Sequence, residues 1–381
     1  MTILATIFIL LGGLIALIYF GYPALLKSGV FGSREPVNKQ PYEPSVSIIV
    51  PAHNEEESIQ AKILNLLAQD YPEDKIEILI GSDGSTDQTE AIVRRHATSR
   101  LKLFVSPQQC GKSGIQNILA AQAQGDILIF TDADCVLAAD AVRQLASNFA
   151  DSEVGLVTCK PTYSNSGKNE ISQNESIYLR YESWIRREES SRGLLAAASG
   201  SFFGIRRQLW QPLDPNVGDD FVLPIDSVLR GFRNVLDESI QVSTVLSQTH
   251  AKTMFRMKMR IISKDLRGLF QNRAVLNPFR HRRVAAALWL HKLLRWFVPY
   301  FLVLLFIDNI FLLQKPIFQV LFALQVAFYV IALGCWFIGE DRTRAPWSIP
   351  LSFCLVNAAA FAGVLHFATG KKMGRWKPVR S

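Results

Sequence analysis

Long apolar runs lie at the two ends of the chain, whereas apolar and polar residues alternate in short blocks through the middle. Residues 3–20 contain no charged side chain. Three more apolar runs follow near the other end, at 296–313, 317–338 and 347–367. About 20 apolar residues suffice to cross the hydrocarbon core of a bilayer. The pattern predicts an N-terminal transmembrane helix within 1–26 and a C-terminal transmembrane region over 284–370.

The first apolar run is expected to be retained rather than cleaved. A secretory signal would carry a basic residue before the run and a small-residue cleavage pattern after it, and neither is present. Lys27, Arg34 and Lys39 follow the run, which places the middle of the chain in the cytoplasm by the positive-inside rule. We therefore expect an integral protein of the inner or plasma membrane. Three full C-terminal crossings would put the basic tail, 371–381, on the opposite side, so the number of crossings stays open.

The middle of the chain alternates between strand-like and helix-like blocks. The blocks expected to be strands are 47–50, 76–80, 101–105, 127–130 and 154–158. Those expected to be helices are 56–69, 87–96, 113–123 and 138–149. Strands that alternate with helices form βαβ units around a parallel sheet that is buried on both faces. We predict an α/β domain over 40–250, with a mostly parallel sheet flanked by helices.

Acidic residues follow three of these strands at the point where each strand ends. Residues 51–56 read PAHNEE, 81–87 read GSDGSTD and 131–134 read TDAD. Ligands of such sheets bind at the carboxyl ends of the strands. A single acid at such a position can be a helix cap, as is expected of Asp87. Three consecutive placements instead predict a shared ligand site.

Asp132 and Asp134 carry the sharpest chemical signal. Two carboxylates on alternate residues at the end of a strand can reach one hard divalent cation, Mg²⁺ or Mn²⁺, whose other ligands are often substrate phosphates. Such a cation would stabilise a nucleotide diphosphate as a leaving group. An Asp-x-Asp sequence is frequent by chance, and its place directly after the strand at 127–130 is what gives it weight.

The sequence GKS at 111–113 invites comparison with a phosphate-binding P-loop. That loop needs glycine five residues before its Gly-Lys pair, where this chain has Ser106, and it needs a strand directly before it. An NTPase is therefore disfavoured. Lys112 could still meet a phosphate as a point charge, or it could be a solvated lysine near the start of a helix.

The net charge of +8 has a local origin. Between residues 252 and 283 there are ten Lys or Arg and one acid, Asp265. A nucleic-acid-binding protein would spread its basic residues over the domain that reads the nucleic acid, so no nucleic-acid partner is expected. The five cysteines show no paired spacing, which fits neither a zinc site nor a disulfide framework.

The basic segment, 251–283, is predicted to contain an amphipathic helix. At 100° per residue, 255–270 separates an apolar face from a basic face. The apolar face comprises Phe255, Met259, Ile262, Leu266, Leu269 and Phe270, and the basic face comprises Arg256, Arg260, Lys264 and Arg267. One interpretation is a helix lying in the plane of anionic lipid headgroups. The other is an ordinary helix that packs its apolar face against protein.

Four motifs in order resemble those of family 2 glycosyltransferases. They read SIIVPAHNEE at 47–56, SDGSTD at 82–87, GK at 111–112 and TDAD at 131–134. The resemblance extends over roughly residues 45–270 and implies a GT-A fold. The apolar ends are similar to those of the membrane-bound branch, which includes cellulose, chitin and hyaluronan synthases.

The resemblance implies a site for a nucleotide-sugar donor. Glu55 and Asp83 would hold the base and ribose, and Asp132 would contact the ribose and phosphate. Asp134, with Asp132, would bind Mg²⁺ or Mn²⁺. The donor-binding residues expected in this way are Ala52, Glu55, Asp83, Lys112 and Asp132.

The same resemblance also implies which residues lie near the acceptor of the sugar. Ser199, Gly200 and Ser201 occupy the place of a short loop near the acceptor, although a simple small-residue turn would look the same. The sequence GDD at 218–220 makes Asp220 the expected base, which would take the acceptor's proton. Direct displacement with one base inverts the anomeric configuration. The alternative is that the two acids only cap a helix.

One motif of the processive synthases is missing. The sequence Gln-x-x-Arg-Trp does not occur, and at the matching distance from Asp220 the chain reads RMKMR, 256–260. Arg256 or Arg260 could steady the departing diphosphate from there. We therefore expect the addition of one or a few sugars rather than processive polymerisation.

Together these features predict a divalent-metal-dependent inverting glycosyltransferase. Its donor would be a nucleotide sugar, UDP-linked by resemblance, and its acceptor a lipid-linked sugar or a polysaccharide at the membrane. One alternative is a polyprenyl-phosphate sugar synthase, and another is a non-catalytic membrane scaffold with a decayed site. A nucleotidyltransferase is disfavoured because no Gly-rich phosphate loop lies near the first strand.

Overall fold

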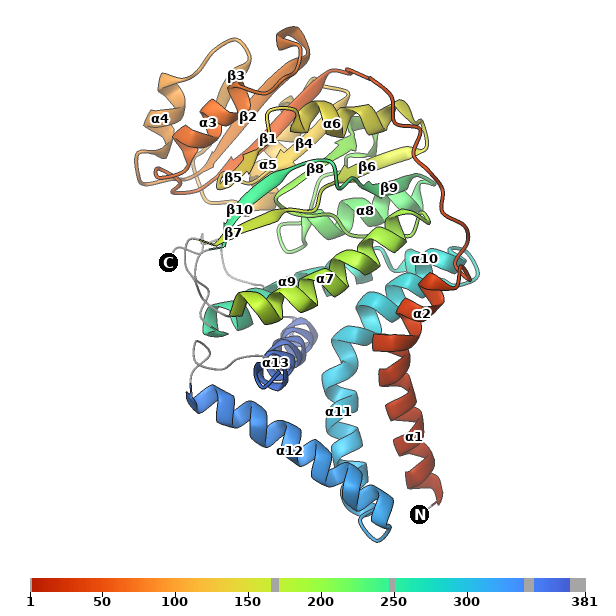
Figure 1. Cartoon of the computed structure of the whole chain (residues 1–381). Helices are drawn as coiled ribbons and strands as arrows, with labels where there is room; N and C mark the ends of the chain where they lie inside the picture. Colours follow the sequence, from red (N-terminus) through yellow and green to blue (C-terminus); the bar gives the residue numbers. More distant parts are fainter. Residues whose placement is uncertain (1, 166–170, 247–250, 339–345, 371–381) are drawn as a thin grey trace.

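An α/β domain sits on one end of a group of long apolar helices (Figure 1). The computed structural model describes residues 2–165, 171–246, 251–338 and 346–370, without the side chains of 163–165, 171–179, 245–246 and 251. The predicted basic tail, 371–381, lies outside the described residues.

The α/β domain is built on a seven-stranded sheet in the order β3-β2-β1-β4-β8-β6-β9. The strands are β1 (Val46–Ala52), β2 (Ile76–Asp83), β3 (Leu101–Ser106), β4 (Ile127–Thr131), β6 (Val154–Thr158), β8 (Phe202–Arg206) and β9 (Arg233–Leu236). β1 pairs in parallel with β2 and β4, and β2 pairs in parallel with β3. Only β8 runs antiparallel to its neighbours, β4 and β6, within this described sheet. The predicted strands and the mostly parallel sheet are confirmed.

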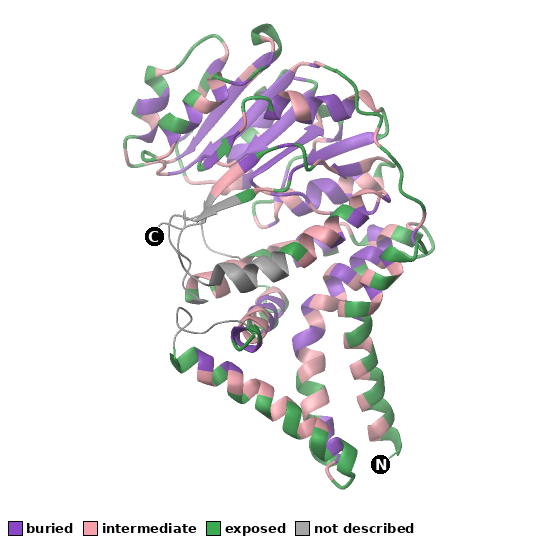
Figure 2. Ribbon diagram, viewed as in Figure 1, coloured by how far each residue is buried: buried purple, intermediate pink, exposed green. Residues whose placement is uncertain are grey.

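Alternate residues of β1 enter different cores, which explains why the strand is apolar throughout. Ile48 packs with α3 (Ile59–Leu67) and α6 (Ala141–Ser147) on one face of the sheet. Ile49 packs with α5 (Gly111–Gln122) on the other face. Because both faces are covered, the central strands are almost wholly buried (Figure 2). α4 (Thr89–Arg95) completes the layer beside α3. These helices are shorter than the predicted blocks but lie within them, apart from α5, which begins two residues early.

A second, three-stranded sheet lies beside the first in the order β5-β10-β7. It consists of β5 (Cys135–Leu137), β7 (Thr162–Asn165) and β10 (Val242–Leu246). β5 begins directly after the TDAD motif, so the motif forms the connection between the two sheets.

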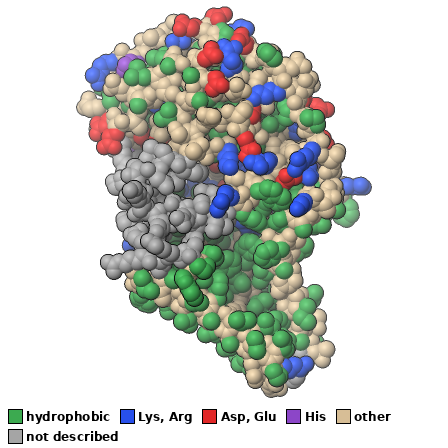
Figure 3. All heavy atoms as spheres, viewed as in Figure 1, with side chains coloured by type: hydrophobic (Ala, Val, Ile, Leu, Met, Phe, Trp, Pro, Cys, Tyr) green, Lys and Arg blue, Asp and Glu red, His purple; other side chains and the backbone are tan. Residues whose placement is uncertain are grey.

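Four helices of the described chain are long and apolar enough to cross a membrane, at Thr2–Lys27, Arg282–Phe311, Pro316–Ile338 and Ser348–Ala368. The first contains α1 (Thr2–Ala16), η1 (Leu17–Gly21) and α2 (Tyr22–Lys27). The second contains α10 (Arg282–Ala287), η6 (Leu288–Leu293) and α11 (Leu294–Phe311). The others are α12 (Pro316–Ile338) and α13 (Ser348–Ala368). In Figure 3 the visible surface of this part is largely hydrophobic, and charged side chains gather on the α/β domain and at its junction.

The basic amphipathic segment forms α9 (Ala251–Gln271), which lies against α13 (Figure 1). Ile262, Leu266 and Leu269 are buried in one cluster with residues of α8 (Asp219–Leu229) and α13. Phe270 stacks on Phe367 at 5.2 Å between ring centroids. Much of the apolar face is therefore covered by protein, as in the second interpretation of the sequence.

We expect α9 and α13 to separate if a side chain is placed between them. A Cβ on Gly363 would lie 3.0 Å from the carbonyl oxygen of Met259 and 3.1 Å from the Cβ of Ile262. Gly363→Leu should lower the free energy of unfolding by about 1–3 kcal/mol, the usual cost of overpacking. The measurement is the thermal unfolding midpoint of the detergent-solubilised chain.

Gly334→Leu on α12 is the matched control, because no other heavy atom lies within 4 Å of a Cβ at Gly334. Equal midpoints for the two variants would contradict the close packing of α9 on α13.

Candidate active site

The first two strand-end loops are joined to each other by hydrogen bonds. The ring of His53 shares a 2.8 Å hydrogen bond between its Nδ1 and the carbonyl oxygen of Asp83. Asn54 Oδ1 accepts from the backbone N–H of Thr86 at 2.7 Å. Ala52, predicted to bind the donor, is fully buried at the end of β1. The two loops therefore form one edge of the candidate site.

Glu55 lies at this edge, half-buried at the approach to α3. Its Oε2 accepts a hydrogen bond from the Ser58 hydroxyl at 2.7 Å, and its backbone N–H donates to Thr89 Oγ1 at 2.7 Å. Glu55 thus lies beside the second loop, and its contact with the base or ribose stays a prediction.

The Asp83 carboxylate stabilises the start of α5. Its fully buried carboxylate accepts from the backbone N–H groups of Cys110, at 2.6 Å, and Gly111, at 2.9 Å. These groups open α5, where an anion is favoured by unpaired N–H groups and by the helix dipole. Asp83 therefore fixes the start of the helix that carries Lys112.

Lys112 connects acids from two parts of the chain. Its Nζ lies 2.8 Å from Asp132 Oδ1 and 3.7 Å from Asp219 Oδ2. Burial opposes the charge of Lys112, but Asp132 and Asp219 hold its pKa above the ordinary value. Asp219 also accepts from Gln116 Nε2 at 2.6 Å, which ties it to α5. The lysine therefore holds together the TDAD motif and the start of α8.

The TDAD motif presents a candidate metal site. Asp132, Asp134 and Cys135 offer one donor atom each within 4.8 Å of one another. Burial raises the pKa of the Cys135 thiol to about 12, and soft sulfur is not a ligand that Mg²⁺ or Mn²⁺ prefers. The two carboxylates, one half-buried and one exposed, suit a hard cation such as Mg²⁺ or Mn²⁺.

A buried lysine that the sequence analysis missed lies under this motif. Lys62 is 2% exposed, and its Nζ donates to Thr131 Oγ1 and to the carbonyl oxygen of Cys135, both at 2.8 Å. Burial lowers its pKa to about 8. Lys62 thus holds both ends of the TDADC loop. Its position between Ile59 and Ile63 on the buried face of α3 was the available signal.

The predicted acceptor loop and the predicted base lie together. The backbone N–H of Ala198 donates to the Asp220 carbonyl oxygen at 2.7 Å. The hydroxyls of Ser199 and Ser201 are hydrogen-bonded at 2.8 Å. A Cβ on Gly200 would come within 3.2 Å of Asp220 Oδ2. The glycine therefore allows the Asp220 carboxyl group to lie against the loop.

Asp220 has the electrostatic character of a base that works near neutral pH. Burial, followed by the charge of Asp219, raises its pKa to about 6, with Lys112 acting in the opposite direction. A carboxylate with such a pKa is ionised at neutral pH yet more basic than an exposed one.

The basic side chains of α9 differ in their exposure and in their interaction with the acids of the candidate site. Arg256 is exposed, and its predicted contact with a phosphate stays a prediction. Burial lowers the pKa of Arg260. Burial and Arg260 lower the pKa of Lys264, whereas Asp219 and Asp220 raise it. Lys264 is therefore close enough to the acids of α8 to interact with them, a relation that the helical pattern could not show.

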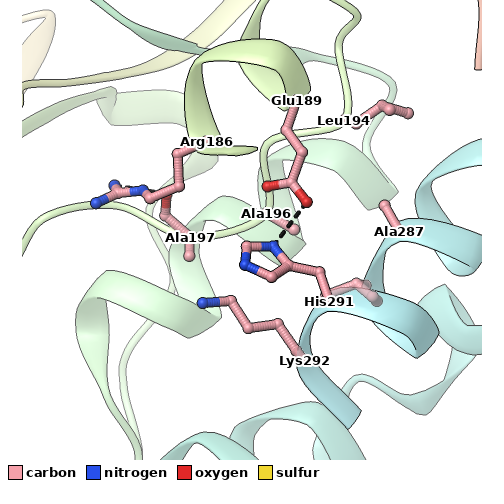
Figure 4. A pocket seen from close by; sticks show the side chains of 9 residues that line it. Arg186, Glu189, Leu194, Ala196, Ala197, Ala287, His291 and Lys292 are labelled. Atoms are coloured by element: carbon pink, nitrogen blue, oxygen red, sulfur yellow. Dashed lines mark hydrogen bonds and ion pairs between the residues drawn. The ribbon is translucent and has the colours of Figure 1, made fainter. Parts of the chain in front are cut away.

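A small pocket lies behind the acceptor loop, between the end of α7 (Ile171–Ser190) and η6 (Figure 4). Arg186 and Lys292 are among the residues that line it, and the Nδ1 of His291 lies 2.7 Å from Glu189 Oε1. Glu189 also accepts from the Tyr22 hydroxyl at 2.6 Å. Helices from both ends of the chain therefore meet on α7.

The four acids that were expected to converge, Asp83, Asp132, Asp134 and Asp220, differ in their relation to Lys112. Asp132 contacts Lys112, and Asp134 offers an oxygen beside Asp132. Asp83 fixes the helix start next to Lys112, and the charges of Lys112 and Asp220 interact. Asp132 and Asp220 thus lie around Lys112 together with Asp219, whereas Asp134 lies beside Asp132 and Asp83 binds backbone N–H groups at the start of α5.

Comparisons with known proteins show which family and fold the chain resembles. Residues 47–212 match the family described as Glycosyl transferase family 2. An N-acetylglucosaminyltransferase of Rhizobium meliloti (strain 1021) is 31% identical over 62% of this chain and 59% of its own length. A beta-monoglucosyldiacylglycerol synthase of Nostoc sp. is 30% identical over 43% of this chain and 36% of its own length. The chain thus spans less than two thirds of either relative.

Among solved structures, the mannosyltransferase PcManGT from Pyrobaculum calidifontis, in complex with GDP-Man and Mn²⁺, superposes with a TM-score of 0.73. The match covers 97% of this chain and 100% of that one at 21% identity, so it establishes the fold. The predicted GT-A fold is confirmed by this likeness, and residues 47–212 match the model of family 2 glycosyltransferases.

Proposed function

We propose that the chain is an inverting glycosyltransferase that moves a sugar from a nucleoside-diphosphate donor to an acceptor at a membrane surface. The observation that carries the proposal is Lys112, which contacts Asp132 of the donor side and lies 3.7 Å from Asp219, the neighbour of Asp220. A single cationic side chain thus links the residues suited to a diphosphate with the residue suited to deprotonate an acceptor.

The donor side is formed by the TDAD motif and its supports. Asp132 and Asp134 would hold Mg²⁺ or Mn²⁺, which would neutralise the diphosphate and stabilise it as a leaving group. Lys112 supplies a fixed positive charge beside Asp132. Lys62 keeps the loop in place through Thr131 and Cys135. The carboxylates therefore need little rearrangement to bind.

The acceptor side is formed by Asp220 and the loop at 199–201. Asp220 takes the proton of the acceptor hydroxyl while the hydroxyl oxygen attacks the anomeric carbon and the bond to the diphosphate breaks. A single displacement of this kind inverts the anomeric configuration. The loop lies against the carboxylate through Gly200 and would fix the attacking hydroxyl nearby.

A UDP-linked donor and a lipid-linked or glycan acceptor are the substrates we propose. The name of the Nostoc relative refers to a glycolipid product, and that of the Rhizobium relative to N-acetylglucosamine. The mannosyltransferase of similar fold is in complex with GDP-Man. GDP-mannose is therefore the donor to test beside UDP-sugars. The candidate membrane spans support an acceptor in the bilayer, with the domain on its cytoplasmic side by the positive-inside rule.

A polyprenyl-phosphate sugar synthase is the second candidate function. Arg260 and Lys264 are partly buried cations with lowered pKa values, and Lys264 interacts with Asp219 and Asp220. The negative charge of a phosphate on the acceptor would pair with the positive charges of Arg260 and Lys264. A neutral sugar acceptor carries no charge that could do so.

The proposed function is tested by donor hydrolysis. The full-length chain in membranes is given UDP-glucose, UDP-N-acetylglucosamine or GDP-mannose with Mg²⁺ or Mn²⁺, with and without a polyprenyl phosphate. We expect metal-dependent release of a nucleoside diphosphate from a UDP-sugar. No release from any donor would favour a decayed scaffold, and release only with the polyprenyl phosphate would favour the second candidate.

Asp134→Ala should weaken metal-dependent binding of the nucleotide diphosphate at least tenfold, because one of two oxygen ligands is lost. Titration calorimetry with the diphosphate at fixed Mn²⁺ is the measurement. Asp140→Ala is the control, an exposed acid that follows β5. Unchanged affinity in Asp134→Ala would remove Asp134 as a ligand.

Asp220→Asn should reduce transfer by about 10²–10⁴-fold and leave nucleotide binding intact, because the amide cannot accept the proton. In the wild-type chain the rate should fall as the pH drops through about 6, where the raised pKa of Asp220 protonates the base. Rates measured across pH check this. Asp226→Asn, a partly buried acid further along α8, is the control. Near-normal turnover in Asp220→Asn would exclude it as the base.

A further inference from the structure

Asp265 is an acid placed where the sequence offers only bases. It is the single Asp or Glu between residues 252 and 283. It lies on α9, on the side that packs against α8, and is partly buried. Three residues further along α9, a Cβ on Gly268 would contact Val222 of α8 at 2.5 Å, which shows how closely the helices approach. The packing of α9 against α8 therefore places Asp265 close to Asp220, the predicted base.

Gly218 shows how close the two acids are. A Cβ at this glycine would lie 3.0 Å from Asp220 Oδ1 and 3.2 Å from Asp265 Oδ1. The two oxygens therefore lie within about 6 Å of each other, a range in which neighbouring charges shift each other's proton affinity. A Cβ at position 218 would make tight contacts with both carboxyl groups. The glycine of the GDD sequence thus makes room for the pair.

We propose that Asp220 and Asp265 act as a carboxyl pair that holds one proton, with Asp220 as the ionised base and Asp265 as its neutral, hydrogen-bond-donating partner. This inference rests on the proposed function for the role of Asp220. It adds a positioning residue that the strand-end motifs do not contain and that α9 supplies.

The charges around Asp265 support this distribution of the proton. Burial, and then the Asp220 carboxylate, raise the pKa of Asp265 well above its ordinary value, and Asp219 adds to the rise. Lys292 of η6 and Lys264 of α9 act in the opposite direction. Asp220, whose pKa is about 6, is also influenced by Lys112 and Asp132. Burial and the neighbouring carboxylates therefore favour the proton on Asp265 rather than on Asp220.

A neutral Asp265 has two effects on the reaction. It avoids a further negative charge beside Asp220 and Asp219, which would oppose the approach of an acceptor oxygen gaining negative charge. It also offers an O–H donor within reach of an oxygen placed between the two carboxyl groups. During transfer the acceptor's proton goes to Asp220, the electrons of the broken bond leave with the diphosphate, and Asp265 keeps its own proton.

The protonation of Asp265 can be tested without any activity. Infrared spectra of the full-length chain in detergent at about pH 7 should contain the C=O stretching band of a protonated carboxylic acid, because burial favours the neutral form. The band should be reduced in Asp265→Asn by one carboxyl group and kept in Asp226→Asn. If the wild-type spectrum minus that of Asp265→Asn shows no such band, the proposal is overturned, whatever the donor-hydrolysis panel gives.

The role of the pair is tested by pH–rate profiles with the UDP-sugar that is hydrolysed in the panel. The wild-type rate should rise through about pH 6 and fall at alkaline pH as Asp265 ionises. Asp265→Asn should lower the rate near pH 7 about threefold and abolish the alkaline fall, while the acid limb stays in place. Asp265→Ala, which lacks a donor, should lower the rate about tenfold.

Asp226→Asn should reproduce the wild-type profile. An alkaline fall that is unchanged in Asp265→Asn would overturn the proposal, and so would a wild-type rate near neutral pH in Asp265→Ala. Either result would leave the proposed function standing, since Asp220→Asn tests that separately.

Discussion

Lys112 lies between two carboxylates that come from different parts of the chain, and the arrangement of the site depends on this position. Asp132 ends a strand of the parallel part of the sheet, whereas Asp219 begins α8, far along the chain. Like charges gathered at one edge would repel each other without a cation among them. The lysine supplies that cation from the protein itself, and Asp83 secures the start of the helix that presents it.

The strand-end motifs could be predicted because local pattern determines them. A buried strand such as 127–130 is recognisable as an apolar run, and the residues directly after it must lie at the edge of the sheet. Asp132, Asp134 and the pairing of β1 with β2 and β4 needed no long-range information. Asp220 was placed by resemblance, and the structure sets it against the loop at 199–201.

The remainder depends on contacts between distant segments. β5 is three residues long and pairs with β10, about a hundred positions later, so no local period indicates it. The sequence around Lys62 gives no sign of its role, because its hydrogen-bond partners, Thr131 and Cys135, lie about 70 residues further along the chain. The partner of the apolar face of α9 could not be chosen from the helix alone, because lipid and protein bury such a face equally well. α13 supplies that partner.

The contacts of α7 with the apolar helices restrict how the protein can sit at a membrane. Tyr22 from the N-terminal helix and His291 from the C-terminal part both bind Glu189, and Arg295 binds Glu182 at 2.9 Å. Anchored at several points, the α/β domain has little freedom to tilt or swivel on its support. If the apolar helices span a bilayer, as we propose, these contacts fix the distance of Asp220 from the bilayer surface. Under the proposed function, an acceptor whose reactive hydroxyl lies at another depth in the bilayer would then be excluded because it could not reach Asp220.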